Sequence, residues 1–241
     1  MIVNMSLRMS LVLAGTALLA ASSGAAVLVV RSSGPSAAAF PAGKALGDTQ
    51  PIKLRANDLL VLLDSRGTRT LRGPGEFSTS AASSSVSGSS LAAVTRQVGS
   101  RRARVQAVRG EPSGATGGRN VWQADVSRSG SVCVANPSDL GLYPGSAASE
   151  AHVTLTDAAS GKSATVHFEV GQSIARWPAD LPVAAGGRFA IKGAGAPATL
   201  QVKMVAPVPS GLEGMAQSFI RNDCNAQLDV LIDTFSAPSG S

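Results

Sequence analysis

The chain has 241 residues, a net charge of +6 and an aromatic content of only 4%. Its core must be built from Val, Leu and Ala, and a binding groove lined with aromatic rings is not expected. The charge is uneven: residues 96–120 carry six basic side chains and one acidic one, whereas residues 121–241 carry seven basic and ten acidic ones. The basic character therefore belongs to one segment rather than to the whole chain.

Residues 1–26 have the order of an export signal. Arg8 is their single charged side chain, an apolar stretch covers residues 9–20, and small residues from 21 to 26 offer a cleavage site. We expect residues 1–26 to be a cleaved signal peptide and the protein to be periplasmic or secreted. The alternative is a retained membrane anchor, because residues 11–30 form a stretch of twenty without a charge, about the length that spans a bilayer. Residues 27–30 would then end the anchor instead of forming a first strand.

Export bears on both the cysteines and the basic charge. Cys133 and Cys224 are the two cysteines, and an even number in an oxidising compartment predicts a disulfide. Two free buried thiols are the alternative. An exported protein with few aromatic side chains to stack on bases is not expected to bind nucleic acid. We expect its partner to be an envelope protein or an anionic envelope component.

Residues 27–78 have the pattern of a small β module. An alternating stretch at 51–55, an apolar stretch at 59–63 and a third stretch at 68–72 predict short strands. Turn signals separate them: Asn57-Asp58, Asp64-Ser65-Arg66-Gly67 and Gly73-Pro74-Gly75.

The segment from Leu54 to Asp58 and the ending Gly73-Pro74-Gly75-Glu76-Phe77 resemble FecR-type periplasmic modules. Residues 27–78 are also similar to uncharacterised exported proteins of Gram-negative bacteria. The chain departs from the FecR pattern at Asn57-Asp58, where Gly-Asp is usual. The resemblance implies a periplasmic β module that contacts a partner, and it implies no catalysis.

Residues 79–120 are expected to be a linker. Ser, Ala, Thr and Gly dominate its first part, which is too polar and small to bury a core. Four arginines follow, and they are our candidates for electrostatic contact with an acidic partner or with acidic lipid headgroups: Arg101, Arg102, Arg104 and Arg109. A solvated connector without a binding role is the alternative.

Residues 121–236 are expected to form a β-sandwich with C-terminal helices, and residues 237–241 a tail. Three hairpins are predicted, pairing 121–126 with 131–134, 152–156 with 164–170, and 188–192 with 199–205. The fold class is therefore mainly β, with a small N-terminal β module and a β-sandwich capped by a helical pair.

The C-terminal part shows two apolar stripes at helical spacing. Ser210 and Glu213 form a capping-box signature before the first stripe. The stripes consist of Leu212, Met215, Ala216, Phe219 and Ile220, and then of Leu228, Leu231, Ile232 and Phe235. We expect both helices to pack on the sandwich, with a Cys133–Cys224 bond joining them to it. Binding of a membrane or partner by these stripes is the alternative.

No motif in the chain predicts catalysis, a cofactor or a metal. Gly161-Lys162-Ser163 lacks the glycine and the following helix of a phosphate-binding loop and is expected to be a hairpin turn. His152 and His167 are expected to be surface side chains; a metal site that they share with Glu169 or Asp157 is the alternative.

We interpret the chain as a non-enzymatic exported envelope protein that acts as a binding, accessory or sensor-type partner. The alternatives are a secreted hydrolase or carbohydrate-binding protein that uses Trp177 and nearby carboxylates such as Asp125, Asp139, Glu150 or Asp180, and a structural component of a surface assembly.

Overall fold

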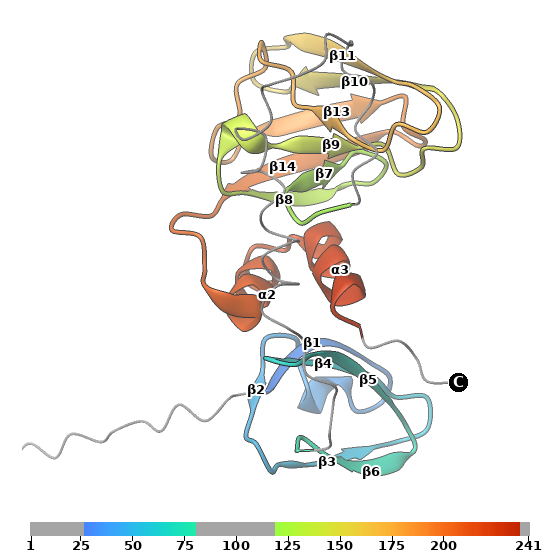
Figure 1. Ribbon diagram of the computed structural model, residues 1–241, viewed down its shortest axis with the longest axis vertical. Helices are drawn as coiled ribbons and strands as arrows, with labels where there is room; N and C mark the ends of the chain where they lie inside the picture. The colour runs from blue at the N-terminus through green and yellow to red at the C-terminus, as the bar shows by residue number, and fades with distance from the viewer. Residues whose placement is uncertain (1–26, 81–118, 237–241) are drawn as a thin grey trace, which may run out of the picture.

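The computed structural model describes residues 27–80 and 119–236, which form two β modules with a pair of helices between them (Figure 1). We call residues 27–80 the N-terminal module, residues 119–209 the C-terminal module, and the two helices the helical pair. The mainly β fold with a sandwich and two C-terminal helices is confirmed. The helices also contact the N-terminal module, as described below.

The N-terminal module has a four-stranded sheet in the order β2-β1-β4-β5 and a two-stranded sheet of β3 and β6. Its elements are β1 (Val27–Ser33), η1 (Ala37–Ala39), β2 (Ala45–Leu46), β3 (Pro51–Leu54), β4 (Leu59–Asp64), β5 (Gly67–Arg72) and β6 (Gly75–Ser78). The strands predicted at 51–55, 59–63 and 68–72 are therefore present.

Strands β1 and β4 are apolar without alternation because both faces of their sheet are buried. Val27 and Val29 of β1 join the internal core of the N-terminal module, together with Leu60 and Leu62 of β4. Leu28, Val30, Val61 and Leu63, which point to the opposite face, join the core around the helical pair. Residues 27–30 thus form the start of β1. A membrane anchor over residues 11–30 would include four residues that belong to this sheet.

The C-terminal module is a sandwich of a five-stranded sheet, β11-β10-β13-β14-β8, and a three-stranded sheet, β12-β9-β7. Its elements are β7 (Gln123–Asp125), β8 (Gly130–Val134), η3 (Pro137–Asp139), β9 (Gly141–Tyr143), β10 (Ala151–Asp157), β11 (Ser163–Phe168), β12 (Ala175–Arg176), β13 (Arg188–Lys192) and β14 (Ala198–Met204). Its core is the apolar cluster that includes Leu142, Leu155, Phe168, Phe189 and Val202.

Two of the three predicted hairpins are confirmed, namely β10 with β11 and β13 with β14. Gly161 lies in the turn between β10 and β11 with a positive φ of 70°, as the hairpin interpretation requires. The hairpin predicted for 121–126 and 131–134 is wrong. β7 pairs in parallel with β9, and β8 pairs in parallel with β14, so the two segments lie in different sheets.

Asp125 explains why these two segments separate. Its Oδ1 accepts hydrogen bonds from the backbone N–H of Ser127 at 3.1 Å and from the Ser127 hydroxyl at 2.6 Å. Such a side-chain turn redirects the chain directly after β7. The chain therefore leaves one sheet at Asp125 and enters the other at Gly130.

The helical pair consists of α2 (Gly211–Arg221) and α3 (Asn225–Thr234). Helix α2 contacts β1 and β4 of the N-terminal module, whereas α3 contacts β7 and β8 of the C-terminal module. The helical pair therefore packs on the sandwich, as expected, and α2 in addition covers the apolar face of the β1–β4 sheet, which is buried in the same core. Ser210 is the N-cap of α2 as predicted, but its side chain makes no capping hydrogen bond.

Neither helix of the described part of the chain has the length and apolarity needed to cross a membrane.

Candidate functional site

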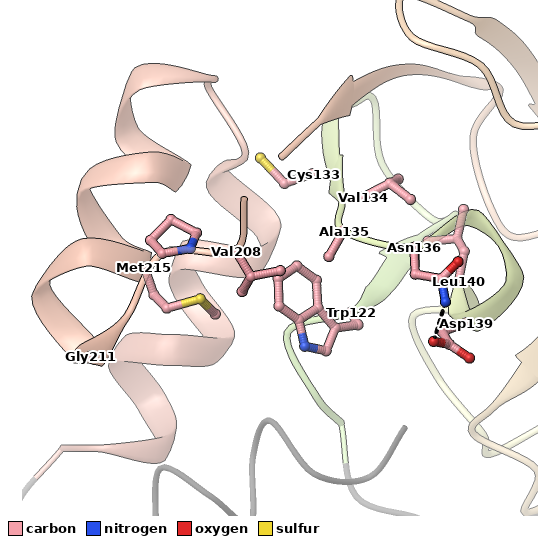
Figure 2. Close-up of a pocket in the computed structure, with 11 residues that line it drawn as sticks. Trp122, Cys133, Val134, Ala135, Asn136, Asp139, Leu140, Val208, Gly211 and Met215 are labelled. Atoms are coloured by element: carbon pink, nitrogen blue, oxygen red, sulfur yellow. Dashed lines mark hydrogen bonds between the residues drawn. The ribbon is translucent and has the colours of Figure 1, made fainter. Parts of the chain in front are cut away.

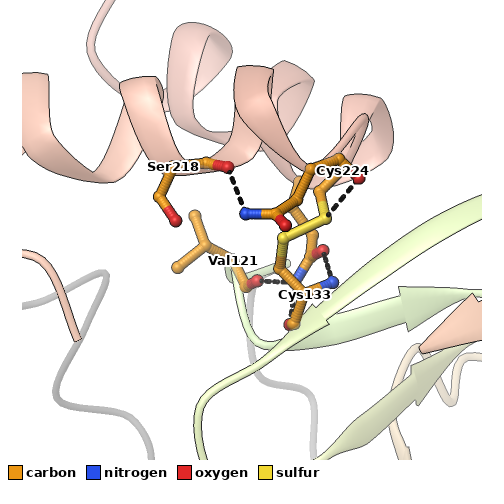
Figure 3. The surroundings of a disulfide bond; sticks show 6 residues. Val121, Cys133, Ser218 and Cys224 are labelled. Carbon is orange, nitrogen blue, oxygen red and sulfur yellow. Dashed lines mark hydrogen bonds between the residues drawn. A yellow bond between two sulfur atoms is a disulfide. The ribbon is translucent and has the colours of Figure 1, made fainter. Parts of the chain in front are cut away.

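A disulfide joins the helical pair to the C-terminal module (Figure 3). Cys133 lies in β8 and Cys224 is the N-cap of α3; their Cα atoms are 5.8 Å apart and both residues are fully buried. The pairing predicted from the cysteine count is therefore present. It fixes the start of α3 against the edge of the five-stranded sheet.

Gln227 of α3 strengthens the same junction with three hydrogen bonds. Its Nε2 donates to the carbonyl oxygens of Val121 at 2.6 Å and Cys133 at 2.7 Å, and its Oε1 accepts from the Cys133 N–H at 2.6 Å. The side chain is 1% exposed. Because buried backbone groups need partners, Gln227 satisfies β8 at a point where no neighbouring strand does so.

A groove of about 440 Å³ lies between α2 and the C-terminal module (Figure 2). We call it the apolar groove. Its lining consists of Trp122, Cys133, Val134, Ala135, Asn136, Asp139, Leu140, Val208, Pro209, Gly211 and Met215. Met215 comes from α2, Val208 and Pro209 from the connection that leads into it, and Asn136 and Asp139 from the η3 turn.

Apolar atoms dominate this groove, and the side chains of its lining residues Asn136 and Asp139 are hydrogen-bonded to each other. Asn136 Nδ2 donates to Asp139 Oδ2 at 2.7 Å, and Asn136 Oδ1 accepts from the Ser138 N–H at 3.2 Å. Asp139 is the only ionisable side chain among the described lining residues, since Cys133 is held in the disulfide. The arrangement suits the binding of an apolar group and brings together no acid–base pair.

A second cleft, of about 430 Å³, is polar and contains an ion-pair network. Asp125 pairs with Arg119 at 2.9 Å and with Arg128 at 3.0 Å, and Asp229 of α3 pairs with Arg128 at 3.1 Å and with Arg31 of β1. The basic groups therefore all have acidic partners within the protein. This network connects both modules to α3.

Trp177 does not offer a surface on which a sugar could stack. It is 9% exposed, its Nε1–H donates to the Leu181 carbonyl oxygen at 2.7 Å, and its ring meets Phe189 edge-on at 4.7 Å between centroids. The packed-loop interpretation of this segment is correct. The four candidate carboxylates of the hydrolase alternative are also dispersed, with Asp125 in the ion-pair network and Asp139 in the apolar groove.

The two histidines lie side by side on the solvent-facing side of the β10–β11 hairpin. His152 and His167 are directly paired across the strands, and their rings stack at 4.6 Å with an angle of 7° between planes. Both donate toward Glu150 Oε1, at 3.1 Å from His152 Nε2 and 2.8 Å from His167 Nε2. The hydrogen bond and charge of His167 lower the pKa of Glu150. The histidines are surface residues, as predicted, but they converge on a carboxylate that differs from the two considered in the sequence.

Arg101, Arg102, Arg104 and Arg109 lie outside the described residues, so their role as electrostatic contacts stays a prediction. No protein-family model matches the chain, and no curated protein or solved structure matches it either. The resemblance of residues 27–78 to FecR-type modules likewise stays a prediction.

Proposed function

We propose that this chain is an exported, non-enzymatic protein of the cell envelope that binds an acidic segment of a partner protein through an apolar anchor residue. The observation that carries the proposal is the apolar groove between α2 and the C-terminal module. Its volume of about 440 Å³ falls in the range of about 300–1,000 Å³ that is typical of ligand sites.

The rim of the groove exposes an apolar side chain that the fold does not use. Val208 is 51% exposed and lies beside Trp122 in the lining (Figure 2). Only one other large apolar side chain in the described residues, Val170, is comparably exposed. An exposed valine at the rim of a concave apolar surface enlarges the contiguous apolar area that is available to a partner.

The walls of the groove are held rigidly before anything binds. Cys133 is fixed by the disulfide and by Gln227, and Met215 belongs to the core that joins both modules. A preformed site loses little conformational entropy on binding. This favours a specific binding role.

The basic segment supplies a reason to expect an acidic partner. Arg119 precedes Trp122 of the groove by three residues, and Arg109 precedes Arg119 by ten. Ten extended residues span at most about 35 Å, so the length of the chain between Arg109 and Arg119 allows Arg109 to reach a partner seated in the groove. A segment with an apolar anchor and acidic flanks would complement both features.

Location in the envelope is supported by the order of residues 1–26 and by the disulfide, since disulfides persist in oxidising compartments. An accessory or sensor-type role for the N-terminal module is compatible with its resemblance to FecR-type modules.

Site-specific photo-crosslinking in the native envelope tests the groove. A photoreactive amino acid at Val208 is expected to capture a partner protein, and the same group at Val170 is the matched control because that valine is also exposed but does not line the groove. Equal capture at both positions, or a crosslink from Val208 only to the chain itself, would contradict the proposal.

The charge is tested separately. Replacing Arg101, Arg102, Arg104 and Arg109 by Gln is expected to weaken recovery of the captured partner and to flatten its dependence on salt. If the variant recovers the partner as well as the wild type at every ionic strength, the four arginines do not contact the partner. The part of the proposal that specifies an acidic partner would then be wrong.

A further inference from the structure

Glu150, His152 and His167 form a cluster at one end of the β10–β11 hairpin. His152 lies in β10 and His167 in β11, and Glu150 directly precedes β10. All three side chains are exposed, at 56% for Glu150, 66% for His152 and 47% for His167. We infer that these three residues form a surface binding site for a divalent cation of the first transition row, with Zn²⁺ as the ion that the donor set fits.

The three donor atoms already converge. Glu150 Oε1 and the Nε2 atoms of both histidines lie within 4.8 Å of one another, and the two oxygen-to-nitrogen distances are 3.1 and 2.8 Å. Ligands at about 2.1 Å from Zn²⁺ lie about 3.4 Å apart in a tetrahedral shell. Small rotations of the three side chains are enough to reach that spacing, because all three are exposed and contact mainly one another.

Strand pairing explains why the nitrogens converge. His152 and His167 are directly opposite in the antiparallel register, and the next pair along the same face is Thr154 and Thr165. Directly opposite side chains have Cβ atoms about 5 Å apart, so two imidazoles can share one ion. The parallel rings place both Nε2 atoms on the side of Glu150.

The donor set selects the class of cation. Two imidazole nitrogens and one carboxylate oxygen are ligands of Zn²⁺ and its neighbours, whereas Ca²⁺ and Mg²⁺ require mostly oxygen ligands. Three protein ligands leave at least one coordination position for water or for a donor from another molecule. The site is open to solvent at this position, since all of its ligands are exposed.

The carboxylate is Glu150, and neither of the two acidic residues that the sequence suggested belongs to the cluster. Asp157 lies at the opposite end of β10, where it accepts a hydrogen bond from the Ser160 hydroxyl at 2.6 Å. Glu169 follows β11 and is also exposed. Both are suitable controls because they carry the same charge on the same hairpin.

Calorimetric titration of the purified chain, without an affinity tag that contains histidine, tests the site. We expect one Zn²⁺ per chain and no binding of Ca²⁺. His152→Ala or His167→Ala should weaken Zn²⁺ binding by about 100-fold, the upper end of what even an outer-shell partner contributes. Glu150→Gln should weaken it as well, whereas Glu169→Gln and Asp157→Asn should bind like the wild type.

A second readout identifies the ligand atoms. Electron paramagnetic resonance of bound Cu²⁺ is expected to show two coordinated nitrogens in the wild type and one in either single histidine variant. Thermal unfolding of each variant confirms that the fold is retained. The inference is overturned if the wild type takes up no Zn²⁺, or if the doubly substituted His152→Ala/His167→Ala chain binds it equally well.

Discussion

Gln227 bonds to both backbone groups of Cys133, and it does so three residues along α3 from the cysteine to which Cys133 is disulfide-bonded. The side chain and the disulfide therefore fix the same residue of β8 from the same helix. One wall of the apolar groove begins at Cys133, so this double attachment also determines the shape of the groove.

Replacing Gln227 by Met keeps the size of the side chain but leaves buried N–H and carbonyl groups without partners. An unsatisfied buried group costs about 1–3 kcal/mol, so we expect Gln227→Met to lower the free energy of unfolding by about 2–4 kcal/mol. Urea unfolding measures the change. Gln217→Met is the control, because Gln217 is only half-buried in α2. Equal effects of the two substitutions would show that the three hydrogen bonds contribute little.

Removing the disulfide is expected to have a comparable or larger effect. The bond closes a loop with a sequence separation of 91 residues, and the loss of such a loop costs on the order of 4–5 kcal/mol in the chain-entropy model. Cys133→Ala/Cys224→Ala should therefore unfold at much lower denaturant concentration than the wild type. Mass analysis under nonreducing conditions should find no free thiol in the mature wild-type protein. Two free thiols would refute the bond itself.

Features encoded by neighbouring residues were predictable from the sequence. The β10–β11 and β13–β14 hairpins have their turn signals between two matching strands, and the apolar stripes of both helices repeat at helical spacing. The segments 121–126 and 131–134 carry the same local signal, yet they pair in parallel with β9 and β14 and not with each other. A parallel pairing leaves no signal at the turn, so the sequence could not reveal it.

The candidate site was less predictable than the fold. Trp122 and Val208 line one groove only because α2 and its connection fold back over η3. Gln227 falls next to an apolar stripe and looks like an ordinary polar helix residue, although its position three residues after Cys224 places it on the side of the disulfide. The two histidines suggested a shared site, but the carboxylate that joins them, Glu150, is set by the position of this residue directly before β10.

Phe219→Ala tests whether the helical pair makes the two modules unfold together. Phe219 is 1% exposed in α2 and meets Trp122 of the C-terminal module edge-on at 6.2 Å, while α2 packs on β1 and β4. We expect a loss of about 3–5 kcal/mol. Hydrogen exchange should then accelerate equally in β4 and in β13. Acceleration confined to one module, or two separate unfolding transitions, would show that the modules unfold independently.

Asp58 links the stability of the N-terminal module to pH. Burial by itself would raise the pKa of this carboxyl, but hydrogen bonds from Ser36 and from the backbone N–H of Arg55 outweigh it and lower the pKa. Because the pKa is lower in the folded than in the unfolded chain, the ionised carboxylate stabilises the fold at pH values above the unfolded pKa of about 3.9. This contribution disappears as the pH falls through the pKa of the folded protein. We therefore expect Asp58→Asn to lower the urea midpoint at neutral pH, and the difference from wild type to shrink below about pH 4. The exposed Asp48→Asn is the control. A difference between Asp58→Asn and wild type that stays constant down to low pH would mean that the carboxylate charge does not hold this turn.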